Sequence, residues 1–155
     1  GVVLSAHGSM EKALFDLKIG DTVKITQTMG EVWDKTQHAL GAGPRILKNG
    51  SVFLTSKVEK FPSDITSGRA PRTALGITKE GHVILATVDG RQSTSIGMTL
   101  LELALFMQEW GAVDAMNLDG GGSSEMVING KILNKPSDGR ERSVGDAVVI
   151  VPKNQ

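Results

Sequence analysis

The stretch TLLELALFMQEWGAVDAMNLDGGGSS, residues 99–124, predicts a helix, a strand and a glycine-rich loop in direct succession. Thr99 is a good N-cap residue, and Glu102 three positions later completes a capping box. The residues that follow are apolar nearly all round, which is typical of a buried helix. Gly111 is expected to end this helix, because glycine readily adopts the left-handed conformation found after helices. Val113–Leu118 then predicts a short strand that leads into the glycines.

Signals on both sides of this unit predict an α+β domain. Two Asn-Gly pairs, at 49–50 and 129–130, favour type I′ hairpins. The run Val83–Val88 is almost wholly apolar, so we expect it in the centre of a sheet covered on both faces. A polar loop is expected over 56–71, a short helix capped by Ser9, and further strands over 2–4, 22–27, 46–47, 52–54, 75–77, 126–128, 131–133 and 147–151. The predicted fold is α+β, with a mixed, mostly antiparallel central sheet and about two helices packed on it.

The composition excludes several classes of function. The chain has 155 residues, enough for one domain with a real core, so we expect a single domain over 1–155. Lys+Arg and Asp+Glu are both 17, and no segment is a basic block, which argues against nucleic-acid binding. There is no Cys, the 3 His residues are scattered, and no run would cross a bilayer as a helix. We therefore expect no cofactor, no soft-metal site and no transmembrane segment, although an oxygen-ligated Ca²⁺ is not excluded.

The loop after residue 118 carries the strongest local signal for a binding site. Gly120, Gly121 and Gly122 are consecutive, which costs chain entropy. Such a run is useful where backbone N–H groups turn inward together and form an anion-binding nest. Ser123 and Ser124 would add hydroxyl donors. The alternative is a plain turn between two strands, but a turn needs only one or two glycines.

Polar side chains at the ends of predicted strands supply the other candidates. Asn117 and Asp119 lie two residues apart, so on a strand both would point to the same face. Asp119 could instead cap the turn through its own backbone. Asp89 and Arg91 also follow an apolar strand, where the carboxylate suits acid–base chemistry and the guanidinium could hold a phosphate. An ion pair between these two residues is the alternative. Arg72, at the start of a strand, is a further candidate phosphate ligand.

Five motifs occur in an order that resembles the phosphodiester glycosidase family. They are RTALGIT (72–78), VDGR (88–91), SIGMT (95–99) with ELA (102–104), NLDGGGS (117–123), and NKPSDG (134–139) with RSV (142–144). The resemblance spans roughly residues 2 to 151. It implies a mixed α+β fold with a central sheet, and a site lined by Asp89, Arg91, Asn117, Asp119 and the glycines.

The family reaction is hydrolysis of a sugar that is joined through its anomeric carbon to a phosphodiester. Glycoside cleavage generally uses two carboxyl groups. Asp119 is the first candidate for base or nucleophile and Asp89 for its partner, with Asn117 beside them, and their assignment stays open. Arginine and nest N–H groups would stabilise the departing phosphate. A non-catalytic module binding carbohydrate or an anionic polymer, and a structural envelope domain, are the rival hypotheses.

The resemblance also carries expectations about the surroundings of the chain. The family usually begins further upstream, so we expect this chain to lack its N-terminal part and to need that missing segment of the same protein as a partner. Its bacterial relatives are mostly exported and associated with the cell envelope, which implies the same localisation here. The expected substrate is a sugar phosphate or glycopolymer.

Overall fold

The computed structural model describes residues 2–152, which fall into two units. One unit comprises residues up to 39 and the other begins at residue 40. We describe each unit by itself. The predicted single domain over 1–155 stays a prediction.

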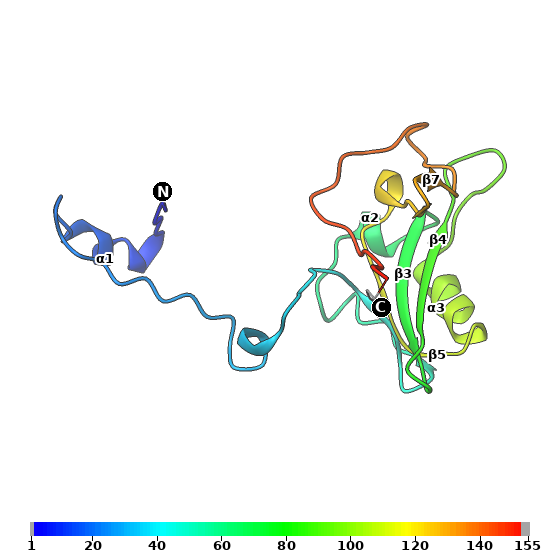
Figure 1. The fold of residues 1–155 in the computed structure, drawn as a ribbon, viewed down its shortest axis with the longest axis horizontal. Coiled ribbons are helices and arrows are strands. Elements are labelled where there is room, and N and C mark those ends of the chain that lie inside the picture. The colour runs from blue at the N-terminus through cyan, green and yellow to red at the C-terminus, as the bar shows by residue number, and fades with distance from the viewer. Residues whose placement is uncertain (1, 153–155) are drawn as a thin grey trace. The chain divides into compact units, whose positions relative to one another are not determined.

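The unit that begins at residue 40 is built around a five-stranded sheet with the order β2-β1-β5-β3-β4 (Figure 1). Each pair of neighbouring strands is antiparallel. The strands are β1 (Arg45–Lys48), β2 (Ser51–Val52), β3 (Arg72–Thr78), β4 (Val83–Val88) and β5 (Ala112–Asn117). The prediction of an α+β fold with a mostly antiparallel central sheet is confirmed.

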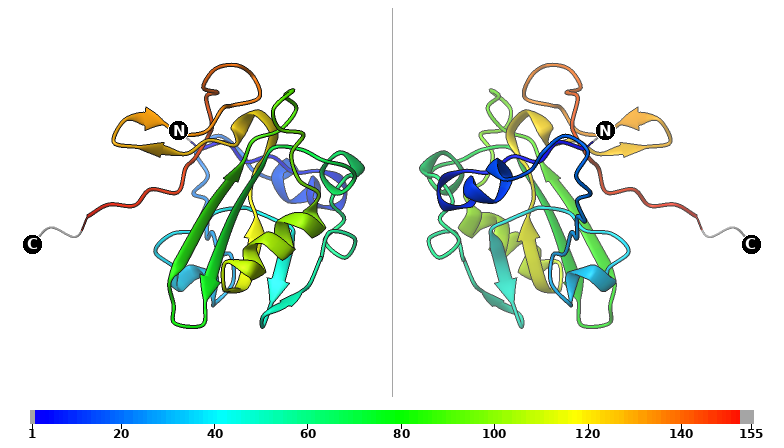
Figure 2. Two further views of the ribbon diagram at one scale, coloured as in Figure 1. Left: turned by 90° about the vertical axis from the view of Figure 1, so that its right-hand side faces the viewer. Right: turned by 90° about the vertical axis from the view of Figure 1, so that its left-hand side faces the viewer.

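Helix α3 (Leu100–Glu109) packs on one face of this sheet (Figure 2). The capping box is present: the Thr99 hydroxyl accepts the Glu102 N–H, and the Glu102 carboxylate accepts the Thr99 N–H. Gly111 follows the helix with φ +87°, as predicted. Below the helix, Gly76 leaves room for a methionine, because a Cβ there would lie 2.7 Å from Met107 Cε.

The helix is only half buried, whereas the sequence predicted a buried helix. Its buried residues recur at helical spacing and form the core with strand residues. Leu101 and Leu105 on the opposite face are 49% and 48% exposed, because no described segment covers that side. An apolar residue on every face of a helix therefore does not guarantee a neighbour on every face.

Strand β4 lies at an edge of the sheet, so the prediction that it is central is wrong. It pairs with β3 through the hairpin at 79–82, and no other described strand pairs with its outer side. Val83 at its start is 60% exposed. An apolar run indicates a strand, but the number of its neighbours depends on what the rest of the chain supplies.

Both Asn-Gly hairpins are confirmed. Asn49 and Gly50 have φ +50° and +75°, and Asn129 and Gly130 have φ +52° and +72°, as a type I′ turn requires. The second pair joins β6 (Val127–Ile128) to β7 (Lys131–Ile132), a separate two-stranded sheet. Short helical turns complete this unit: α2 (Ser63–Thr66), inside the stretch predicted as loop, and the 3₁₀ turn η3 (Gly121–Ser123).

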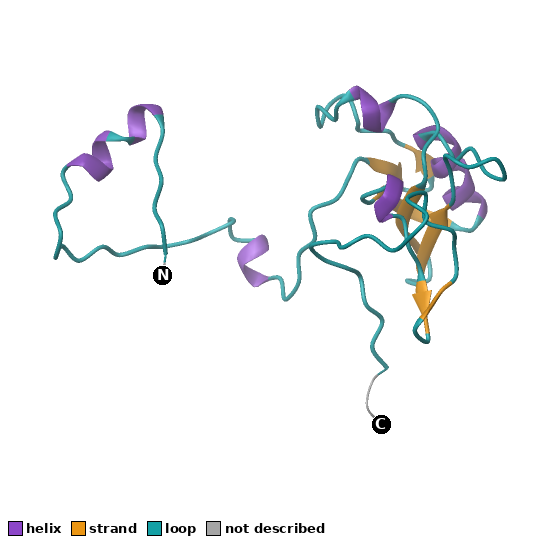
Figure 3. Cartoon of the chain, turned by 90° about the horizontal axis from the view of Figure 1, so that it is seen from above, coloured by secondary structure: helices purple, strands orange, loops and turns teal. Residues whose placement is uncertain are grey.

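Among its described residues, the unit up to residue 39 has no strand (Figure 3), and none of its side chains is buried. It holds three single turns: η1 (Gly8–Met10), α1 (Lys12–Phe15) and η2 (Trp33–Lys35). The helix predicted from Ser9 is therefore split, and His7, not Ser9, precedes its first turn. The strands predicted over 2–4 and 22–27 are wrong, because no described segment pairs with either.

The strand predicted over 147–151 is also wrong. These residues are extended coil, and Val149, Ile150 and Val151 are at least 72% exposed. A strand forms only where a neighbour completes its hydrogen bonds, and the described residues supply none here. Among residues 2–152 no helix has the length and apolar character needed to cross a membrane.

Candidate active site

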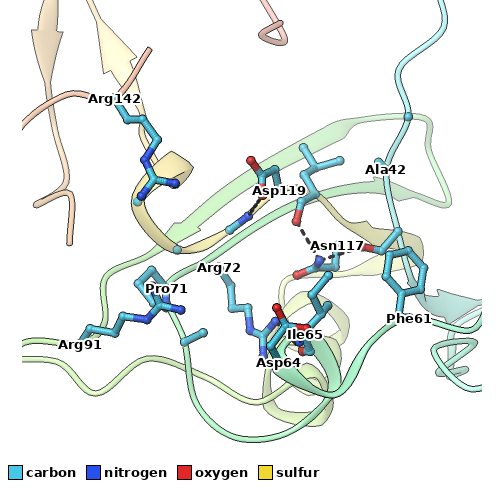
Figure 4. Close-up of a pocket in the computed structure, with 17 residues that line it drawn as sticks. Ala42, Phe61, Asp64, Ile65, Pro71, Arg72, Arg91, Asn117, Asp119 and Arg142 are labelled. Atoms are coloured by element: carbon cyan, nitrogen blue, oxygen red, sulfur yellow. Dashed lines mark hydrogen bonds between the residues drawn. The ribbon is translucent and has the colours of Figure 1, made fainter. Parts of the chain in front are cut away.

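A cavity of about 650 Å³ opens where β5 ends and β3 begins (Figure 4). It is lined by residues 41–43, Phe61, residues 64–65, 70–72 and 117–122, and by Arg91 and Arg142. The antiparallel pairing of β3 with β5 explains the position, since it brings residue 72 and residue 119 to the same end of the sheet. Seven of the ten candidate residues line this cavity: Arg72, Arg91, Asn117, Asp119, Gly120, Gly121 and Gly122.

Asn117 is locked into the end of β5. Its side-chain Nδ2 donates to the carbonyls of Gly43 (2.9 Å) and Leu118 (2.7 Å), and its backbone N–H donates to Pro44 O (3.0 Å). The residue is 3% exposed, and its Oδ1 has no donor among the described residues. These bonds define the orientation of the amide, because a flipped group would place its oxygen against two carbonyls. The catalytic role of Asn117 stays a prediction.

Asp119 is exposed at the cavity and carries one hydrogen bond. Its Oδ1 accepts the N–H of Gly120 at 2.9 Å, which is the turn-capping contact foreseen as an alternative. Among residues 2–152, Oδ2 has no hydrogen-bond or ion-pair partner. Asp119 thus caps the loop with one oxygen, and the other is left without a partner among the described residues.

Each of the three glycines makes room for a group of the protein itself. A Cβ at Gly120 would lie 2.8 Å from the carbonyl oxygen of Pro71. Gly121 has φ +63°, and a Cβ there would lie 3.2 Å from Arg91 Nη1. At Gly122 a Cβ would overlap Arg142 and its partner Asp138. Close packing therefore accounts for the run of glycines.

The predicted anion nest is not formed, because most of its N–H groups are used within the chain. Four of the five N–H groups from residue 120 to 124 have acceptors, and only that of Gly122 has none among the described residues. The four bonds are Gly120 N to Asp119 Oδ1, Gly121 N to Pro71 O, Ser123 N to Gly120 O and Ser124 N to Gly121 O. Ser123 and Ser124 do not line the cavity, and Ser124 is 1% exposed. Their roles in binding stay predictions.

Arg72 is buried and ties three segments together. Its Nε donates to Met98 O (2.9 Å), Nη1 to Ile65 O (3.0 Å) and Nη2 to Gly68 O (3.2 Å). Burial, and secondarily the charge of Arg91, lower the pKa of Arg72, and an arginine nevertheless stays protonated near neutral pH. These bonds position the wall of the cavity, and phosphate binding by Arg72 stays a prediction.

Two further guanidinium groups lie beside the glycine loop. Arg91 is exposed, has φ +57°, and lies against Gly121. Arg142 is bound by Asp138 through Nε at 2.8 Å and Nη2 at 2.6 Å, and this pair packs on Gly122. Together with the N–H of Gly122, which has no acceptor among the described residues, they place donors along one side of the cavity. Asp138 balances the charge of Arg142, whereas Arg91 has no ion-pair partner among residues 2–152.

Comparison with known proteins identifies the family of the chain. Residues 1–151 match the phosphodiester glycosidase family. The chain belongs to this family. It is 31% identical to the mouse N-acetylglucosamine-1-phosphodiester alpha-N-acetylglucosaminidase over an alignment of 153 positions that covers 89% of this chain and 29% of the mouse protein. The chain thus spans less than a third of that relative's length.

Two solved structures resemble the fold of this phosphodiester glycosidase family member. A hypothetical protein from Synechocystis superposes with a TM-score of 0.61 at 32% identity, over 71% of this chain and 20% of that one. The zebrafish N-acetylglucosamine-1-phosphodiester alpha-N-acetylglucosaminidase catalytic domain, auto-inhibited by its pro-peptide, superposes with a TM-score of 0.52 at 32% identity. That match covers 60% of this chain and 33% of the zebrafish chain.

Asp89, a candidate from the family motif, does not line the cavity. Its carboxylate accepts the N–H of Lys135 at 2.9 and 3.1 Å, and the side chain of Asn134 at 3.1 Å. The alternative of an ion pair with Arg91 is wrong for the described residues, whose ion pairs do not include Asp89. A catalytic role for Asp89 stays a prediction.

Two charged residues of the cavity were missed in the sequence. Asp64 lies in α2, within a polar stretch that gave no local signal, and its Oδ1 accepts the N–H of Ile65 at 3.0 Å. Arg142 could have been found, because it belongs to one of the family motifs. Asp64 brings a second carboxylate to the cavity that holds Asp119.

Proposed function

We propose that the protein hydrolyses the bond between a sugar and a phosphodiester. One observation supports this most. The carboxylate of Asp119, whose Oδ2 has no partner among the described residues, lines the same cavity as the guanidinium groups of Arg91 and Arg142. Membership of the phosphodiester glycosidase family supports the same reaction. A neutral glycoside would need no such guanidinium groups, whereas a phosphodiester places its charge next to the bond that breaks.

The proposed reaction consumes one water molecule. The bond between the anomeric carbon and the phosphate oxygen breaks, the water oxygen ends on the anomeric carbon, and the phosphomonoester leaves. Asp119 would act as general base or as nucleophile. Arg91, Arg142 and the Gly122 N–H would stabilise the charge on the leaving phosphate, so a strong acid is less necessary. Asp64, the other carboxylate of the cavity, is a candidate partner of Asp119.

The proposed substrate class follows from the activity for which the relatives are named. We propose a sugar-1-phosphodiester, with N-acetylglucosamine as the first sugar to test. We further propose, on the family resemblance alone, that in a bacterial cell it acts outside the cytoplasm on a glycopolymer with such a linkage.

The decisive experiment is turnover of the methyl ester of N-acetylglucosamine-1-phosphate beside a neutral methyl glycoside of the same sugar. We expect release of free sugar from the phosphodiester and a much smaller kcat/KM for the glycoside. Equal kcat/KM values would contradict the phosphate hypothesis. Binding without turnover, seen as a thermal shift with sugar phosphates, would favour the rival hypothesis of a carbohydrate- or anionic-polymer-binding module.

A further inference from the structure

The carboxylate of Asp89 faces a surface segment rather than the cavity. We define the arm as residues 134–142, which follow β7. All three hydrogen bonds of this carboxylate go to the first two residues of the arm: Oδ1 accepts from Asn134 Nδ2 and Lys135 N, and Oδ2 accepts from Lys135 N. A charged acceptor makes such bonds stronger than a neutral one.

Further hydrogen bonds hold the same end of the arm. Asn134 Oδ1 accepts the N–H of Met126 at 2.9 Å, and its Nδ2 donates to Ser124 O at 2.8 Å. Gln92 Nε2 donates to Lys135 O at 2.6 Å. The base of the arm is therefore fastened to the loop after β4 and to the end of the glycine loop.

The other end of the arm reaches the cavity. Asp138 and Arg142 form their ion pair there and occupy the space above Gly122. Apart from the turn bond from Gly139 N to Pro136 O, the arm has no regular structure, and residues 138–142 are exposed. Its position therefore depends on the bonds at its base.

We propose that Asp89 is a positioning residue that fastens the arm so that Arg142 lies at the cavity. This inference rests on the proposed function for the nature of the ligand. Asp89 would then act through Arg142 on binding of the substrate phosphate, and it would not take part in bond cleavage.

The substitution Asp89→Asn separates a positioning residue from a reacting one. An amide keeps one oxygen, which can still accept from Asn134 and Lys135 as Oδ1 does now. An amide cannot act as a base or nucleophile. We expect Asp89→Asn to keep at least roughly a tenth of kcat/KM, whereas Asp89→Ala raises KM about 10-fold or more with little change in kcat.

The kinetic test compares Asp89→Asn, Asp89→Ala, Arg142→Ala and the double variant Asp89→Ala/Arg142→Ala, with the methyl ester of N-acetylglucosamine-1-phosphate as substrate. If Asp89 acts through Arg142, the double variant is no worse than Arg142→Ala alone. If the losses of kcat/KM in the two single variants multiply in the double variant, the inference is overturned. A loss of about 10³-fold in Asp89→Asn would also overturn it, because that size indicates a reacting carboxylate.

Hydrogen exchange without substrate tests the fastening itself. In Asp89→Ala we expect the Lys135 amide and its neighbours in the arm to exchange faster, while the amides of α3 keep their protection as a control for folding. Unchanged protection at Lys135 would overturn the inference. If the wild-type protein turned over no sugar phosphodiester, the proposed function would fail, and exchange would still decide whether Asp89 holds the arm.

Discussion

The ends of β4 and β5 look alike in sequence and differ in the structure. Each strand runs into an aspartate and then a glycine, Asp89-Gly90 and Asp119-Gly120. The carboxylate of Asp119 bonds only its own loop and lies at the cavity, whereas that of Asp89 is fully engaged by the arm. The same local sequence pattern thus places a candidate reacting group at the end of β5 and a structural support at the end of β4. The difference comes from the segment of the chain that packs against each strand end.

The largest effect is expected for Asp119→Asn. The amide keeps the oxygen that caps Gly120 but cannot serve as base or nucleophile, so kcat should fall by roughly 10³-fold. The melting temperature should change little. Steady-state kinetics and thermal unfolding, measured beside Asp89→Asn, check this. Full activity would remove Asp119 from the chemistry, and unfolding would make it a structural turn residue.

Arg142→Ala should have the next largest effect. Removing a charge-assisted contact to phosphate should raise KM for the phosphodiester about 10- to 100-fold. Any kcat/KM for a neutral glycoside should stay the same. Arg140→Ala is the matched control, because Arg140 is exposed and does not line the cavity. Equal losses on both substrates would show that Arg142 does not recognise the anion.

Gly122→Ala should have a smaller effect. It tests the contact between the glycine loop that follows β5 and the arm that Asp89 holds at the end of β4. Its Cβ would displace Arg142 and Asp138 from the glycine loop, which should cost about 1–3 kcal/mol of stability and raise KM several-fold. Gly145→Ala is the control, since a Cβ there meets nothing within 4 Å. Chemical unfolding measures the loss of stability, and steady-state kinetics measures KM. An unchanged KM would show that the position of Arg142 does not affect substrate binding.

The smallest effect is expected from chelation. Among residues 2–152 no group of three or more His, Asp or Glu side chains is arranged to hold a metal ion. Activity in EDTA should therefore stay within about twofold of that in its absence. Loss of activity that Ca²⁺ or Mg²⁺ restores would show that the open oxygens of Asp119 and Asn117 serve a cation.

Local signals were sufficient for the parts of the fold that close over short distances. The capping box of Thr99 and Glu102, the helix end at Gly111 and both Asn-Gly hairpins were all predicted, because each depends on a few consecutive residues. Strand β4 was predicted with its observed bounds. Its place at the edge of the sheet was not, since that depends on distant segments.

The errors have a common physical cause. The alternating residues 22–27 and the apolar residues 147–151 have the pattern of strands, yet no described segment completes their hydrogen bonds. Asp64 was missed for the same kind of reason, because the side chain of the distant Arg72 binds the Ile65 and Gly68 carbonyls of its loop beside the cavity. A sequence pattern indicates which secondary structure a segment can form. The distant segments that pair with it decide whether that structure forms.

The glycine loop also constrains how this sequence could diverge. The space that a Cβ would need at each glycine is occupied by a different distant segment. Pro71 lies beside Gly120, Arg91 beside Gly121, and Arg142 with Asp138 beside Gly122. At Gly122 a side chain would be tolerated only if Asp138 or Arg142 shortened or moved in the same lineage, because the neighbours there are side-chain atoms, whereas the neighbour of Gly120 is a backbone carbonyl and Gly121 has φ +63°. A larger residue at 122 should therefore appear only together with changes at 138 or 142. A library that randomises the loop alone should return glycine at 122, whereas one that also varies 138 and 142 should recover alanine or serine there.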